Sequence, residues 1–153
     1  MKKLAKIIFL FYLGLTKIVA SDYYVSSSAF LSGNGSFNNP WQLQQALNSP
    51  DVIKNSKDTV WIWLKGGTYK NTFDAQTSFS CFTKGKDNAP IIFRNYHNER
   101  VIIDGQLLYT MAFVLGNCND TWIWGLEFLN SSVSDRDHPI AERLGNVYST
   151  AEN

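Results

Sequence analysis

The chain has 153 residues, with 14 Lys and Arg against 13 Asp and Glu, and aromatic residues make up 14% of it. Four of the lysines and none of the acids fall in the first twenty residues, so the rest of the chain has ten basic and thirteen acidic residues, a net charge of −3. A mildly acidic domain lacks the basic patches of nucleic-acid-binding proteins, which excludes that class of partner. The remaining length suits one domain.

Residues 1–20 have the pattern of a secretory signal peptide. Three lysines form a positive start, an apolar run follows at 7–15, and Ala20 precedes the expected cleavage point. The apolar run is shorter than the ~20 residues that a membrane span needs. We therefore expect an exported protein (periplasmic, cell-surface or extracellular) that has no membrane contact after cleavage; a membrane anchor, suggested by the interruption at Lys17, is the alternative.

Residues 21–57 are predicted to contain a strand, a loop and one helix. A short strand signal at 22–26 is followed by a segment rich in Ser, Gly and Asn up to Asn39, which is typical of a loop. A helix is then predicted from Pro40 to Leu47, because Asn39 can cap it, proline fits the first turn, and apolar residues recur at helical spacing.

Residues 58–132 alternate apolar and polar positions with a period of two, which predicts strands. Similar lead-ins begin at Asp58, Asn88 and Asp120, at spacings of 30 and 32 residues. A fixed period of this length indicates a solenoid of about three coils, in which stacking supplies the core. An immunoglobulin-like sandwich also uses short strands, but it does not explain the recurring lead-in. The residues expected to face inward are Val60, Ile62, Leu64, Ile91, Phe93, Ile123, Leu126 and Phe128.

The predicted helix at Pro40–Leu47 has a structural role in this scheme. The first coil of a solenoid exposes a sheet edge that would promote aggregation. The helix has the position and the apolar face to cover that end.

Cys81 and Cys118 are the two cysteines of the chain. An exported chain permits a disulfide, but spacing alone does not establish one, because geometry decides. A disulfide and two buried free thiols both stay open. A metal site on two cysteines without nearby histidines is not expected.

Several stretches together resemble the N-terminal part of secreted right-handed parallel β-helix proteins of the pectate-lyase-like family. They cover about residues 22–132, and the last of them is similar to a "DGLEF" element with Trp in place of Asp. The stretches are Tyr23–Ser26 with Asn39–Trp41, Asp58–Tyr69, Ala89–Tyr96, Val101–Gly105 and Trp124–Phe128.

The resemblance implies an all-β, right-handed parallel β-helix with an N-terminal capping helix, related to polysaccharide lyases and in contact with acidic polysaccharide. The resemblance also implies that catalytic coils lie beyond Asn153, so residues 133–153 are expected to be a polar loop or part of a further coil, and residues 21–153 are expected to lack lyase activity. No cofactor is evident; calcium is suggested by the resemblance alone. A non-catalytic carbohydrate-binding or cell-surface β-helix protein is the alternative, and the oligomeric state is not indicated.

The candidates for acid–base chemistry are His138, Asp135 and Asp137, because a histidine beside carboxylates can act as a general base or a metal ligand. The same residues lie in the most polar part of the chain, so a solvated loop is the structural alternative. Lys65, Arg94, Asp104 and Glu127 are interpreted as solvated or turn-forming charges.

Four tryptophans are the candidate substrate-binding residues: Trp61, Trp63, Trp122 and Trp124. They alternate with inward positions and should therefore point outward. Aligning Ile62, Ile91 and Ile123 predicts one outward column of Trp63, Ile92 and Trp124, and another of Trp61, Pro90 and Trp122. Such an apolar patch usually marks a binding surface, and flat indoles suit sugar rings. The alternative is that residues 26–39 or 133–153 fold over the rings.

Overall fold

The computed structural model describes residues 21–71, 79–106, 113–130 and 147–148. The predicted signal peptide at 1–20 and the candidates Asp135, Asp137 and His138 lie outside these residues. Within them, the strands are β1 (Ser21–Val25), β2 (Val60–Leu64), β3 (Gly67–Lys70), β4 (Phe79–Ser80), β5 (Ile91–Asn95), β6 (Val101–Asp104), β7 (Phe113–Val114), β8 (Thr121–Trp124), β9 (Leu126–Leu129) and β10 (Val147–Tyr148).

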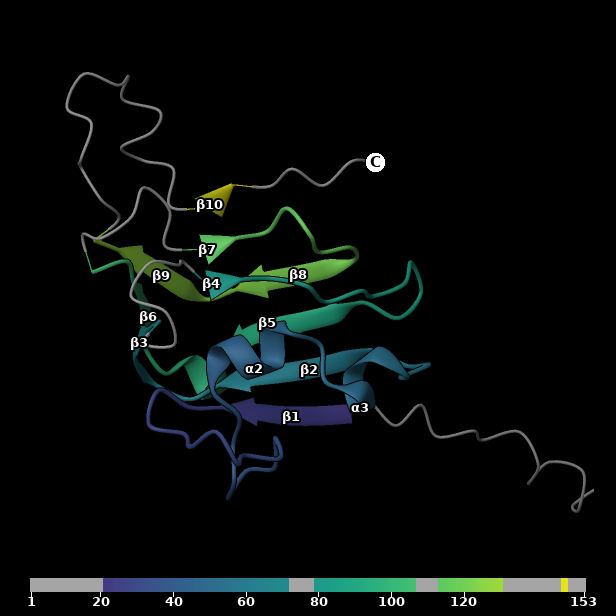
Figure 1. The fold of residues 1–153 in the computed structure, drawn as a ribbon, viewed down its shortest axis with the longest axis horizontal. Coiled ribbons are helices and arrows are strands. Elements are labelled where there is room, and N and C mark those ends of the chain that lie inside the picture. Colours follow the sequence, from purple (N-terminus) through teal and green to yellow (C-terminus); the bar gives the residue numbers. More distant parts are fainter. Residues whose placement is uncertain (1–20, 72–78, 107–112, 131–146, 149–153) are drawn as a thin grey trace, which may run out of the picture.

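The strands form three sheets in the orders β1-β2-β5-β8, β3-β6-β9 and β10-β7-β4. Every pairing within these sheets is parallel. The chain visits the three sheets in turn, so paired residues are 25 to 39 positions apart in the sequence. The strands β1, β2, β5 and β8 run side by side in one direction (Figure 1). This arrangement is consistent with a parallel β-helix, and the parallel pairing excludes an immunoglobulin-like sandwich for the described residues.

The predicted inward positions form the core. Val60, Ile62 and Leu64 of β2 and Ile91 and Phe93 of β5 are all buried. The three predicted inward residues of the last coil, Ile123, Leu126 and Phe128, are partly buried and pack against that core. They are less covered because β8 and β9 stand at the ends of their sheets among the described strands.

The predicted vertical alignment of the coils is wrong by two residues at β5. Ile62 pairs with Phe93, which pairs with Ile123, whereas Ile91 pairs with Val60 and Thr121. A shift of two residues leaves every side chain on the same face of a strand, so the alternation of apolar residues does not detect it. Pro90 lies before β5 and is not part of either outward column.

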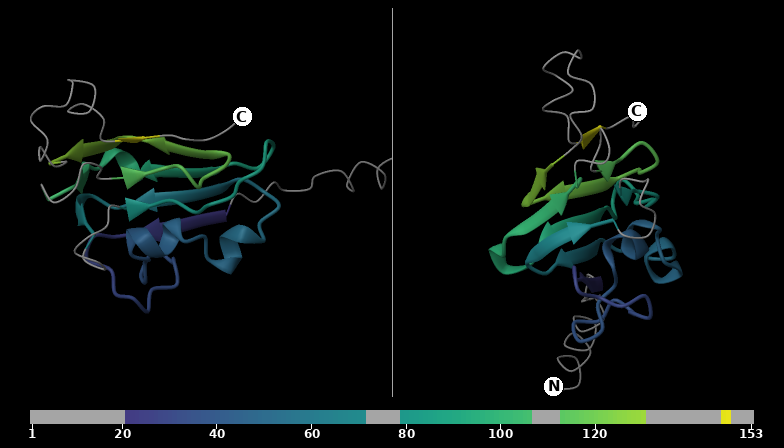
Figure 2. Two further views of the ribbon diagram at one scale, coloured as in Figure 1. Left: turned by 45° about the horizontal axis from the view of Figure 1, so that its top comes forward. Right: turned by 60° about the vertical axis from the view of Figure 1, so that its left-hand side comes forward.

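The N-terminal cap contains two short helices rather than one, α2 (Leu43–Leu47) and α3 (Asp51–Lys54). The first begins at Leu43 instead of Pro40, because Trp41 forms a parallel bridge with Val25 and is therefore extended. Both helices lie beside the first strands, at the end of the stack opposite β9 (Figure 2). Leu43, Ala46 and Leu47 are buried in the core, as expected for a cap.

Gln44 shows how the cap closes an open sheet edge. Its side-chain Oε1 accepts a hydrogen bond from the Ser80 backbone N–H at 3.0 Å, and its Nε2 donates to the Ser80 carbonyl at 2.8 Å. The amide group thus replaces a neighbouring strand for β4. The Phe82 backbone N–H donates to the Leu47 carbonyl at 2.9 Å beside it, so polar groups at this edge are paired.

Candidate functional site

The outward side of the first sheet carries two columns of side chains, set by the strand register. One column is Asp22, Trp61, Ile92 and Trp122, and the other is Tyr24, Trp63, Arg94 and Trp124. We call these eight residues the aromatic face. The four tryptophans come together on one surface, as the sequence predicted. In the column of Trp61 and Trp122, Ile92 stands where Pro90 was predicted, and in the column of Trp63 and Trp124, Arg94 stands where Ile92 was predicted.

Trp61 and Trp63 form the stacked half of the aromatic face. Their rings are stacked, with centroids 5.2 Å apart and planes 9° apart. The Trp63 Nε1–H donates a hydrogen bond to Asp22 Oδ1 at 2.9 Å, which fixes the ring orientation. Ile92 lies on the outward side between Trp61 and Trp122 yet is only 3% exposed, because its neighbours cover it.

Trp122 and Trp124 form the open half of the aromatic face. Each is 48% exposed, and their rings are 5.6 Å apart at an interplanar angle of 45°. The guanidinium carbon of Arg94 lies 5.9 Å from the centre of the Trp124 ring, within the range of a cation–π contact. This half therefore presents two indoles and a cation to solvent.

The loop after β1 reaches the aromatic face at one end only. The Phe37 ring packs edge-on against Tyr24 at 5.1 Å and at a tilt of 58° against Tyr96 at 5.8 Å, and the Lys65 Nζ lies 3.7 Å from the centre of the Phe37 ring. Tyr96 in turn meets Trp63 edge-on at 6.3 Å. Burial raises the pKa of Tyr24, and the nearby Asp22 carboxylate raises it further. The sequence analysis left open whether residues 26–39 or 133–153 cover the tryptophans. Residues 26–39 contact this end of the aromatic face, and 133–153 lie almost wholly outside the described residues.

The four charges that the sequence assigned to structural roles lie on outward or turn positions. Lys65 donates to the Phe37 carbonyl at 2.7 Å, and Glu127 receives a bidentate hydrogen bond from Arg100. The hydrogen bond from Arg100 holds the pKa of Glu127 below its usual range. The predicted register placed Arg94 outside the tryptophan columns, whereas the structure pairs it with Trp63 and Trp124.

Asp104 links two turns of the chain. Its Oδ1 accepts hydrogen bonds from the Gln106 backbone N–H and from the Asn130 side chain, both at 2.9 Å, and its Oδ2 lies 3.4 Å from the Lys70 Nζ. Burial raises the pKa of Asp104, but the hydrogen bonds from Asn130 and Gln106 and the charge of Lys70 outweigh it, so the net pKa is lowered. The bond to Gln106 is the turn role that the sequence predicted.

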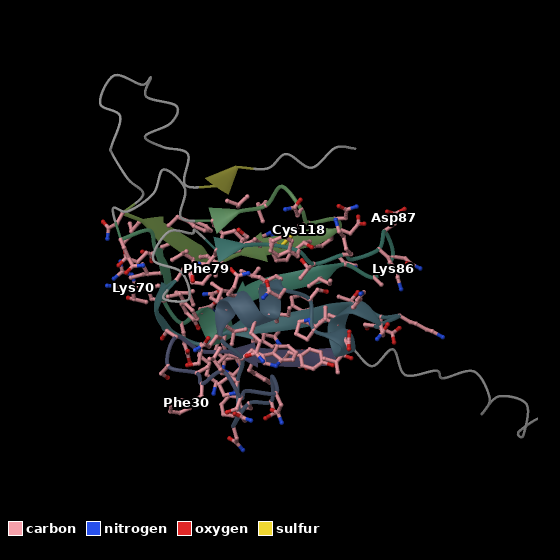
Figure 3. All side chains as sticks on the ribbon, viewed as in Figure 1. Phe30, Lys70, Phe79, Lys86, Asp87 and Cys118 are labelled. Atoms are coloured by element: carbon pink, nitrogen blue, oxygen red, sulfur yellow. A yellow bond between two sulfur atoms is a disulfide. The ribbon has the colours of Figure 1, made fainter. Side chains whose placement is uncertain are left out.

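Cys81 and Cys118 form a disulfide, with Cα atoms 5.6 Å apart, which decides between the two alternatives left by the sequence. Cys118 is labelled in Figure 3, between β7 and β8. The part of the chain with described residues contains no group of three or more His, Cys, Asp or Glu suited to a metal ion. Across the same residues, no helix is long and apolar enough to span a bilayer.

No family model matches the chain. It is 33% identical to pectate lyase PEL9 of Emericella nidulans over 60% of this chain and 20% of the relative, and 26% identical to the uncharacterized protein YwoF of Bacillus subtilis over 80% of this chain and 28% of the relative. The crystal structure of pectate lyase Pel9A matches with a TM-score of 0.49 and 22% identity, over 72% of this chain and 28% of that one.

The chain thus spans a fifth to under a third of the length of the curated relatives it matches. Similarity in sequence to PEL9 and YwoF accompanies three parallel sheets that are consistent with a β-helix. The chain is therefore distantly similar, over part of its relatives' length, to pectate-lyase-like β-helix proteins.

Proposed function

We propose that the chain is part of a secreted, right-handed parallel β-helix protein that contacts acidic polysaccharide through its aromatic face. The observation that carries the proposal is the pair of half-exposed indoles, Trp122 and Trp124, next to the Arg94 guanidinium. Large exposed apolar patches are unusual on soluble domains and mark binding surfaces. Indole rings offer flat faces to sugar rings, and a neighbouring cation suits a sugar acid.

Two further observations support an exported protein in this role. The disulfide between Cys81 and Cys118 is typical of proteins in oxidising compartments. The pattern at 1–20 is that of a signal peptide, which directs export to such compartments. The similarity to a protein named pectate lyase supports an acidic polysaccharide as the ligand class.

A binding experiment tests the proposal. Purified protein is titrated with pectate oligomers by isothermal titration calorimetry, and tryptophan fluorescence is followed in parallel. Trp41 is buried and stacks on Tyr23 at 4.9 Å, so a change in emission reports mainly on the four tryptophans of the aromatic face.

Trp124→Ala is expected to weaken binding by about tenfold, since truncation of an aromatic contact residue commonly costs more than 1 kcal/mol. Phe30→Ala is the matched control, because Phe30 is an aromatic side chain that is 79% exposed on the outer loop, away from β5 and β8 (Figure 3). An equal loss in both variants, or no binding by the unchanged protein, would refute the proposal.

A lyase is the second candidate, and the similarity to PEL9 favours it. Cleavage of pectate by a lyase leaves an unsaturated product that absorbs ultraviolet light. We expect binding without a rise in absorbance, with or without calcium. A rise that tracks the protein concentration would instead make the chain catalytic.

A further inference from the structure

Arg94 lies on β5, between the two halves of the aromatic face. It pairs in register with Trp63 on one side and with Trp124 on the other. Its side chain is half-buried, and its guanidinium lies against the Trp124 ring. A guanidinium beside an indole is partly shielded from water, which strengthens its interaction with an incoming anion.

The charge of Arg94 is not neutralised by a neighbour among the described residues. The ion pairs found there join Lys70 to Asp104 and Arg100 to Glu127. Asp22, the acid on the aromatic face, lies in the other column on β1, two strands away from β5, and accepts the hydrogen bond of Trp63. Arg94 is thus a cation with donors left for a ligand.

The tryptophans around Arg94 differ in what they can offer to a ligand. Trp61 and Trp63 stack face to face on each other, so each ring uses one of its faces within the pair. Trp122 and Trp124 are tilted and half-exposed, and Trp124 is the ring next to Arg94. The free indole face and the free cation therefore come from adjacent strands.

We infer that Arg94 and Trp124 form a subsite for a uronic acid, in which the indole stacks on the sugar ring and the guanidinium binds the carboxylate. The inference rests on the proposed function and adds the residue that makes the site select charged over neutral sugars. The planar fork of arginine matches the two oxygens of a carboxylate, which lysine does not. Neighbouring strands are about 4.8 Å apart, so a sugar chain that follows the Trp63–Arg94–Trp124 column runs across the strands.

The test compares two ligands with the same sugar chain, one with charged carboxylates and one in which they are neutral methyl esters. Oligogalacturonate and its methyl ester share one sugar chain, and the ester has no carboxylates. Binding of both is measured by calorimetry for the unchanged protein, Arg94→Gln, Arg94→Lys and the charge control Lys54→Gln. Lys54 is exposed at the end of α3, so its removal changes net charge without touching the aromatic face.

The unchanged protein should prefer the acid to the ester. Arg94→Gln should weaken binding of the acid by about tenfold or more, the size expected for a hydrogen bond to a charged group, and leave binding of the ester unchanged. Arg94→Lys should restore part of the loss, and Lys54→Gln should have no effect. Added salt should weaken binding of the acid alone, a measurement that needs no variant.

Two results separate the failure of this inference from the failure of the proposed function. If the protein binds both ligands and Arg94→Gln affects them equally or not at all, the carboxylate subsite is wrong while the aromatic face still binds sugar. If the unchanged protein binds neither ligand, both proposals fail.

Discussion

Removal of the Cys81–Cys118 disulfide should lower the free energy of unfolding by about 4 kcal/mol. The two cysteines are 37 residues apart, and closing a loop of that length in the unfolded chain corresponds to roughly 13 cal/mol/K of entropy, or about 4 kcal/mol at about 25 °C. The disulfide joins Cys81, directly after β4, to Cys118, which lies between β7 and β8. Both β4 and β7 are strands of only two residues. The crosslink should therefore matter more here than beside the longer strands of the first sheet.

The assay is urea unfolding followed by far-ultraviolet circular dichroism, on the oxidised protein, the reduced protein and the double variant Cys81→Ala/Cys118→Ala. Reduction removes only the sulfur–sulfur bond, so it controls for the loss of packing in the double variant. Hydrogen exchange at the Cys81 amide, which donates to the Val114 carbonyl at 2.9 Å, should speed up in both cases. A change below about 1 kcal/mol, with unaltered exchange at this amide, would refute the loop-closure reasoning.

Three further predictions concern the turns and the cap. Gly125→Ala should destabilise the fold by about 1–3 kcal/mol in urea, because Gly125 has φ of +69° and an added Cβ would collide with the Asn95 side chain; an unchanged midpoint would contradict this. Gln44→Leu should lower the free energy of unfolding by about 1–3 kcal/mol, since it leaves the Ser80 N–H and carbonyl without their side-chain partner. Gln44→Glu keeps an acceptor for the Ser80 N–H and should lose less stability. Equal stability of the unchanged protein and both variants would rule the mechanism out. The pKa of Asp104 is lower in the folded chain than in the unfolded one, so its carboxylate stabilises the fold above the ordinary carboxyl pKa, and this contribution is lost as the pH falls through the folded pKa. Asp104→Asn should therefore be less stable at neutral pH and lose less stability on acidification, and parallel pH profiles of the two proteins would argue against this linkage.

Much of the fold could be predicted from the sequence because its signals are local. Alternation in β2 assigns Val60, Ile62 and Leu64 to one face, and the repeat of about 30 residues indicates stacking rather than hairpins. The start of the helix was misplaced by three residues. Asn39 and Pro40 do not start the helix, whose N-cap is Gln42 with no side-chain cap hydrogen bond. The bridge between Trp41 and Val25 holds that segment extended, and this contact joins residues 16 positions apart.

The candidate site could be predicted in part. The outward direction of the four tryptophans follows from the alternation within each strand, which is a property of the backbone. The place of Arg94 between Trp63 and Trp124 does not follow from it, because a shift of β5 by two residues preserves the alternation. An alignment that placed Phe93 rather than Ile91 beside Ile62 would have found it.

The sequence by itself determined the longer strands such as β2 and β5, the residues in them that face the interior, and the repetition of the coils, since each depends on neighbours a few positions away. It did not predict β3 and β4, which begin at Gly67 and Phe79. Only the tertiary structure decided the register between coils, the pairing of Cys81 with Cys118, and the meeting of Arg94 with Trp124. These depend on how turns of different length bring distant strands together, and on which stacking buries the interior side chains best. The distance between two residues in space is set by that packing and cannot be read from their separation along the chain.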